Sequence, residues 1–99
     1  MNLRKKIFSN MPNIPEGIEV FLFGSTLFTE NVNDIDLALV YNSKIISISE
    51  ILEFRKLVKQ KIIGTIGIEC QIIALSNEEN IELEFIKNVK SEKVQTASS

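Results

Sequence analysis

Three short apolar runs constrain the fold of this chain more than any other feature of its sequence. They read IEVFLFG at residues 18–24, DIDLALVY at 34–41 and IGIECQIIAL at 66–75. Each has the length and the residue types of a strand, whereas the stretch between the second and third runs follows a helical period. Sequences of this kind form α/β domains, so we expect a small sheet of at least three strands flanked by helices.

Helical signals precede, separate and follow these strands. The segment LRKKIFSNM at 3–11 has apolar residues at helical spacing and predicts a short opening helix. Ser47, with a glutamate three residues later, forms a capping box that opens an amphipathic helix, and Gly64 is the expected end of that helix. A second capping box begins at Ser76 and predicts a last helix that reaches about Val89.

The chain is expected to form one domain. Its 99 residues contain neither an internal repeat nor a linker long enough to divide residues 1–99. We place the core at about residues 18–87 and a polar tail at about 88–99, where KSEKVQTASS is expected to fray or to wait for a partner. A core this small favours a partner protein or self-association.

Composition excludes several classes of function. The formal net charge is −2, so the chain lacks the strongly basic surface of many nucleic-acid-binding proteins. It contains no histidine, which excludes imidazole bases, Ser-His triads and most zinc sites. Its one cysteine, Cys70, predicts a buried thiol in a reducing cytoplasm. With no apolar run longer than a strand and no signal peptide, we expect a soluble cytoplasmic protein without membrane contact.

Two carboxylates stand where the second strand begins. Side chains two positions apart on a strand share a face, so Asp34 and Asp36 are expected to project together, away from the apolar residues that alternate with them. Two like charges this close disfavour each other's ionised form, and burying them without a partner is costly. A divalent cation resolves both problems, and Mg²⁺ is bound by one or two carboxylates together with substrate phosphates. The pair therefore predicts a magnesium site.

Two further features adjoin this pair. Glu69 interrupts the third apolar run, and a two-metal site usually uses one more acid to hold its second ion. Gly24 ends the first strand, where a glycine lets the backbone approach a ligand, and a helical turn after it would direct N–H groups and the Ser25 hydroxyl at phosphate. Thr26 is a further candidate for a phosphate contact.

Each feature taken alone has a simpler interpretation. Aspartates at the start of a strand are often solvated turn residues, and a serine after a glycine is usually a helix N-cap. Glu69 also suits an exposed sheet edge. The joint order and spacing of these residues are more specific than any one of them.

In that order and spacing the chain resembles the DNA polymerase β-like nucleotidyltransferase superfamily, and within it the minimal nucleotidyltransferases. The family signature is a hydrophobic strand ending in Gly-Ser, a spacer of roughly ten residues, Asp-x-Asp followed by apolar residues, and a later strand with an acid between apolar residues. Here it reads FGS at 23–25, DIDL at 34–37 and IEC at 68–70. The resemblance covers about residues 18–75, more than half of the chain.

The resemblance implies a nucleotidyltransferase fold with a mixed sheet and a site on its surface. It implies that Asp34 and Asp36 bind two Mg²⁺ ions, for which Mn²⁺ can substitute, and that Glu69 helps to hold the catalytic ion. Residues 24–26 would hold the β- and γ-phosphates of a nucleoside triphosphate such as ATP. An acceptor hydroxyl would attack the α-phosphorus in line, and pyrophosphate would leave.

Two acceptor classes follow from the resemblance. Some small relatives are antitoxins that nucleotidylate a tyrosine of a partner toxin, often a helical ribonuclease of the HEPN type. Other members build oligonucleotides or nucleotide signals in antiviral defence, so nucleic acid is an acceptor or product there. The small size of this chain favours a protein partner or a homo-oligomer in either setting.

Two departures from the family pattern support a second interpretation. The spacer TLFTENVN carries no arginine, and the third acid is Glu69 where the family usually has aspartate. These departures favour a catalytically silent binding module, either an antitoxin or a nucleotide sensor that acts by contact. A more distant alternative is an unrelated α/β domain whose acids bind calcium or nothing.

Overall fold

The computed structural model describes residues 3–24, 33–88 and 90–94. Along the chain its elements are α1 (Leu3–Asn10), β1 (Ile18–Phe23), β2 (Asp34–Tyr41), α2 (Ile48–Ile66), β3 (Glu69–Ser76), α3 (Asn77–Leu83), α4 (Phe85–Asn88) and β4 (Ser91–Val94). The predicted α/β class is confirmed, and each of the three predicted strands is present.

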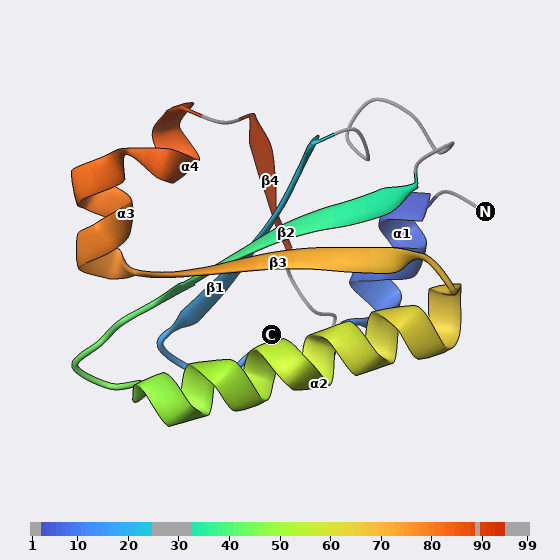
Figure 1. The fold of residues 1–99 in the computed structure, drawn as a ribbon, viewed down its shortest axis with the longest axis horizontal. Helices are drawn as coiled ribbons and strands as arrows, with labels where there is room; N and C mark the ends of the chain where they lie inside the picture. The colour runs from blue at the N-terminus through green and yellow to red at the C-terminus, as the bar shows by residue number, and fades with distance from the viewer. Residues whose placement is uncertain (1–2, 25–32, 89, 95–99) are drawn as a thin grey trace.

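One mixed sheet organises the fold. Its strand order is β3-β2-β1-β4, with β1 antiparallel to β2 and to β4, and β2 parallel to β3. A parallel pair needs a long crossover, and α2 supplies it between β2 and β3. Figure 1 shows α2 running along the sheet, while α3 and α4 stand together at the far end of β3.

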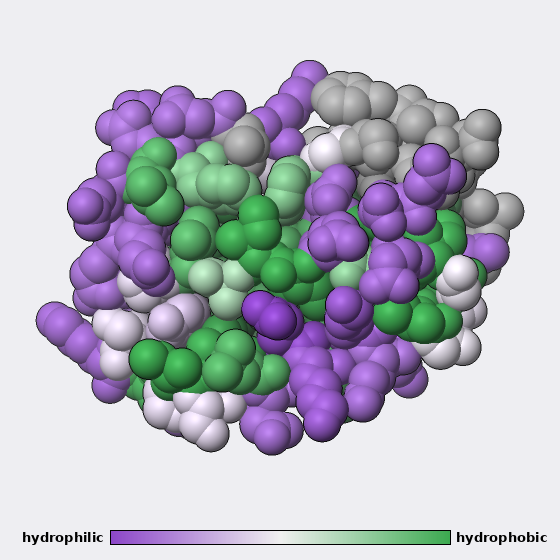
Figure 2. Space-filling model, viewed as in Figure 1, coloured by the Kyte–Doolittle hydropathy of each residue, from purple (hydrophilic) through white to green (hydrophobic). Residues whose placement is uncertain are grey.

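The core lies between one face of the sheet and the helices α1 and α2. Alternate residues of the strands enter it, such as Leu22 of β1 and Leu37 of β2, and Val58 of α2 packs with them. All three are fully buried. In Figure 2 hydrophobic residues come to the surface over the middle of the sheet, and α3 exposes Ile81 and Leu83 among its hydrophilic residues.

Helix α2 begins at its predicted capping box but ends later than predicted. Ser47 accepts from the Glu50 N–H, and the Glu50 carboxylate accepts from the Ser47 N–H. The helix continues past Gly64 to Ile66 and is capped by Gly67, whose φ of 81° is left-handed. A glycine is tolerated inside a helix when packing supports the rest of it, whereas the left-handed cap specifically favours glycine.

Two other predicted boundaries change as well. Because α2 extends to Ile66, β3 begins at Glu69 rather than at residue 66. The last predicted helix, from Ser76 to about residue 89, is divided into α3 and α4 at Glu84, which has a φ of 50°.

The polar tail predicted at 88–99 is partly wrong. Residues Ser91–Val94 form β4, which pairs with β1, and Val94 is buried with 1% of its surface exposed. The proposed core of residues 18–87 is also too narrow, because Leu3 and Ile7 of α1 pack into the same core. A four-residue strand with one apolar side chain has too little period to be recognised in the sequence.

The burial of Cys70 follows the prediction. Its thiol is fully buried in the core, and burial raises its pKa to about 12. Within the part of the chain that the structure describes, no helix is long and apolar enough to cross a membrane.

Candidate functional site

Asp34 and Asp36 lie at the start of β2 on the face of the sheet opposite α1 and α2, and α3 and α4 cover the other end of this face. The alternating residues Ile35 and Leu37 are fully buried in the core. Asp34 is exposed and Asp36 is partly buried. The two carboxylates therefore share a face, as the strand period predicts.

Gly24 lies against the second of these carboxylates. The β1–β2 register pairs Phe23 with Asp36, and Gly24 follows directly with a φ of 80°. A Cβ at position 24 would collide with Oδ2 of Asp36 and lie 3.2 Å from its Cγ. The left-handed backbone therefore favours glycine here, and any other residue would also have to displace the Asp36 side chain. The glycine of one motif and the second acid of the other are neighbours in the fold.

The environment of Asp36 disfavours its charge. Partial burial, and secondarily the neighbouring carboxylate of Asp34, raise the pKa of the Asp36 carboxyl. Among the described residues no lysine or arginine forms an ion pair with either aspartate. The residues outside the described ranges include no lysine or arginine. The pair is thus a local concentration of acid that no lysine or arginine of the described residues neutralises by an ion pair.

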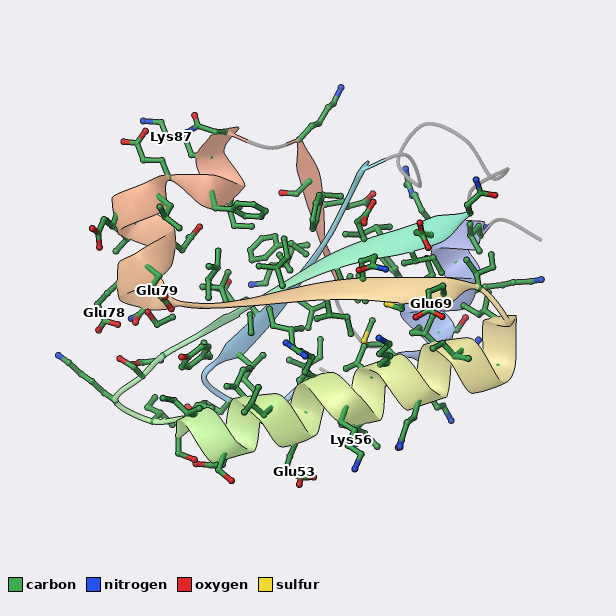
Figure 3. All side chains as sticks on the ribbon, viewed as in Figure 1. Glu53, Lys56, Glu69, Glu78, Glu79 and Lys87 are labelled. Atoms are coloured by element: carbon green, nitrogen blue, oxygen red, sulfur yellow. The ribbon has the colours of Figure 1, made fainter. Side chains whose placement is uncertain are left out.

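Glu69 lies on the neighbouring strand β3, directly opposite Asp34. The parallel β2–β3 register places Glu69 opposite Asp34 at the first position of an edge strand. Its Oε1 atom lies 3.5 Å from Nζ of Lys59 on α2, and its side chain is 53% exposed. Figure 3 shows Glu69 between β3 and α2. The strand pairing brings this acid to the site, but its carboxylate is engaged by the helix.

A cluster of three metal-ligating side chains is not formed by the residues that the structure describes. The fold brings Asp34, Asp36 and the Gly24 backbone together. Glu69 lies opposite Asp34, but its carboxylate is ion-paired with Lys59. Ser25 and Thr26, the predicted phosphate contacts, lie outside the described residues.

Two further residues belong to this region and were not predicted as site residues. Gln71 is opposite Asp36 in the β2–β3 register and is exposed on the same face. Its alternation with Glu69 along the strand was the available signal. Lys59 had no such signal, because its place beside Glu69 depends on how α2 packs against β3.

Comparisons of the chain with protein-family models, with curated proteins and with solved structures found no match.

Proposed function

We propose that this chain is a Mg²⁺-dependent nucleotidyltransferase, which moves a nucleoside monophosphate from an NTP or dNTP to a hydroxyl acceptor. The observation that carries the proposal is the acid pair Asp34 and Asp36, set against the Gly24 backbone at the start of β2, where Asp34 is exposed. The order and spacing of the sequence motifs, which resemble the polymerase β-like family, supply the rest of the argument.

The two aspartates suit a magnesium ion. Mg²⁺ commonly takes only one or two protein carboxylates and completes its octahedron with water and substrate phosphates, so a third protein ligand is not required. Burial and like charge both oppose ionisation of Asp36, and a divalent cation offsets both effects. When bound, the ion would neutralise triphosphate charge and make the acceptor hydroxyl more acidic.

The residues of the chain would divide the remaining work. Asp34 and Asp36 would hold the cation, and the close backbone at Gly24 would leave room for phosphate oxygens beside it. Once its ion pair with Lys59 is broken, Glu69 could accept the proton of the acceptor hydroxyl or bind a second metal ion. The acceptor oxygen forms its bond to the α-phosphorus as the bond to pyrophosphate breaks.

The acceptor falls into one of two classes under this proposal. One is the tyrosine hydroxyl of a partner protein, such as a HEPN-like toxin, and the other is the 3′-hydroxyl of a nucleotide or oligonucleotide in antiviral defence. Both classes suit an acid pair with one exposed member, Asp34, because a large acceptor can reach it.

The test combines binding with turnover. Purified protein is titrated with each NTP and dNTP in the presence of Mg²⁺ or Mn²⁺, and pyrophosphate release and labelled products are followed. The Asp34→Ala/Asp36→Ala double variant is the control. We expect metal-dependent triphosphate binding that the control lacks, and turnover once an acceptor is supplied. Equal binding by wild type and control would overturn the proposal.

The Lys59–Glu69 ion pair favours one alternative, a nucleotidyltransferase-fold module that binds without turnover. In the enzyme, Glu69→Gln should reduce turnover strongly, while Lys59→Met should preserve it by releasing Glu69. In a silent module, both variants should bind nucleotide like the wild type. A partner protein that is still neutralised by the Asp34→Ala/Asp36→Ala variant would support the module.

A further inference from the structure

The two edges of the sheet differ in how they are protected. The β4 edge is only four residues long, and its two charged residues are ion-paired, Glu92 with Arg4 and Lys93 with Glu19. Short, charged edges are a common means of preventing strand-to-strand association. This edge of the sheet is therefore closed to further pairing.

The β3 edge has none of these protections. β3 is eight residues long, ECQIIALS, and carries one charge, at its first position, and no proline or lysine. No other strand of the described residues pairs with its outer side. Figure 1 shows β3 in the foreground with no helix in front of it. A long apolar edge strand with free backbone groups is a template for another strand.

Ile73 lies in the middle of this edge, on the face that carries Asp34 and Asp36. It is 39% exposed although it lies in a strand, and apolar residues surround it in the sequence. Its neighbour Ile72 points to the opposite face, where it packs against the core. Figure 2 shows hydrophobic surface in the region over β3.

We propose that the outer edge of β3 pairs with β3 of a second copy of this chain, antiparallel about a two-fold axis at Ile73. In this register Ile73 meets Ile73 of the second copy, and Gln71 meets Leu75 of the second copy. Residues opposite one another in an antiparallel pair share a face, so the two exposed Ile73 side chains are buried against each other. The two sheets join into one continuous sheet.

The distribution of charge on β3 favours a second copy in this orientation. Glu69 is the only charged residue of the strand and lies at one end. Antiparallel pairing about Ile73 puts the two Glu69 side chains at opposite ends of the contact, about 25 Å apart at the usual rise per residue. A parallel arrangement would place them side by side and is destabilised by their repulsion. A two-fold contact is also self-limiting, because it uses both open edges.

This arrangement leaves the acid pair accessible. The two-fold axis is perpendicular to the sheet, so the acid-bearing faces of both copies lie on the same side. Asp34 and Asp36 are on β2, one strand away from the new contact. The dimer therefore does not depend on the proposed enzymatic function, and either can fail without the other.

The first experiment measures association over a concentration series by analytical ultracentrifugation. Wild type is expected to form a dimer. Ile73→Lys is expected to weaken association by about tenfold or more, because it places two like charges directly opposite each other. Ile81→Lys, at a 74% exposed position on α3, is the matched control and should leave association unchanged. A monomeric wild type, or equal effects of the two variants, would overturn the proposal.

The second experiment tests the register without disrupting the fold. Ile73→Cys is exposed to oxidised glutathione, and the disulfide-linked dimer is measured on a non-reducing gel. Opposed Cα atoms in an antiparallel pair are about 4.5–5.5 Å apart, within disulfide range. Gln71→Cys should not cross-link, since its two copies would lie about 13 Å apart. The wild-type protein serves as the blank, because its one cysteine, Cys70, is buried and has a raised pKa. Absence of the Ile73→Cys dimer, or equal cross-linking by Gln71→Cys, would contradict this pairing.

Discussion

The charge of Asp36 has opposite effects on the stability of the fold and on the proposed chemistry. The ionised carboxylate would bind the metal ion, but its environment disfavours the charge. Its pKa in the folded protein is raised above the ordinary value of 3.8, first by burial and then by Asp34. The folded state thus holds the proton more tightly than the unfolded state does. The free energy of unfolding therefore falls as the pH rises from about 3.8, the pKa in the unfolded chain, through the raised pKa of the folded protein. At neutral pH the Asp36 carboxylate reduces stability.

Replacing Asp36 with asparagine should stabilise the fold and remove the proposed function. In the absence of divalent cations, Asp36→Asn is expected to gain about 0.5 kcal/mol, typical of a surface charge contact, and to raise Tm by roughly 2–4 °C at neutral pH. The gain should vanish in acid, where the wild-type carboxyl is protonated. Added Mg²⁺ with a triphosphate should stabilise only the wild type. Thermal unfolding measurements at two pH values test this, and a lower Tm for the variant at neutral pH would contradict it.

Gly24 offers a second test at the scale of one residue. Gly24→Ala adds a Cβ that collides with Asp36 at a φ of 80°, so we expect a loss of about 2 kcal/mol. Gly67→Ala has the same left-handed backbone but open space, and should lose about 1 kcal/mol. Gly64→Ala, inside α2, should gain about 0.5–1 kcal/mol. Urea unfolding ranks the three variants, and equal losses for Gly24→Ala and Gly67→Ala would argue against the collision.

At the scale of elements, local signals were predictable and tertiary ones were not. Both capping boxes, at Ser47 and at Ser76, form as the sequence predicts, because their partners lie three residues away. The sequence predicts the end of α2 at Gly64, because nothing local distinguishes Gly64 from Gly67, which is the actual C-cap of the helix. β4 could not be predicted from the sequence, because the burial of its one buried side chain, Val94, depends on pairing with the distant strand β1.

The capping box of α2 gives a prediction at this scale. Ser47→Ala removes the acceptor of the Glu50 N–H and should cost about 1 kcal/mol, or roughly 4–8 °C in Tm. Ser49→Ala, at an exposed position in the first turn of the same helix, is the control and should change Tm little, because alanine favours helix. Calorimetry measures the Tm of both variants. A similar decrease of Tm in Ser49→Ala would show that loss of the cap is not the cause.

The candidate site is assembled at the scale of the whole molecule. The sequence identified Asp34, Asp36 and Glu69, because two acids at a strand start and one acid in an apolar run are local patterns. The register that sets Glu69 opposite Asp34 requires the parallel pairing of β2 with β3. The contact with Lys59 requires the position of α2 on the finished sheet. Such relations between elements cannot be read from spacing along the chain.

Val94 tests how far the whole fold depends on its last described strand. Val94→Ala removes buried methyl groups from the core beside β1 and should cost roughly 2 kcal/mol. Lys93→Ala removes only an exposed ion pair with Glu19 and should cost less than about 1 kcal/mol. Denaturant unfolding measures both. Equal small losses would mean that β4 contributes little to stability.

The pairing of β1 with β4 also has a kinetic consequence. β1 is synthesised well before β4, yet Val20 and Val94 are partners in the finished sheet. While the chain is being made, β1 therefore leaves the ribosome with one side of its backbone unpaired. Contacts between such distant residues form slowly, because a long loop must close first. The nascent chain consequently exposes one edge of an apolar strand until β4 has been made, and during that interval it is open to capture by chaperones or to misassociation.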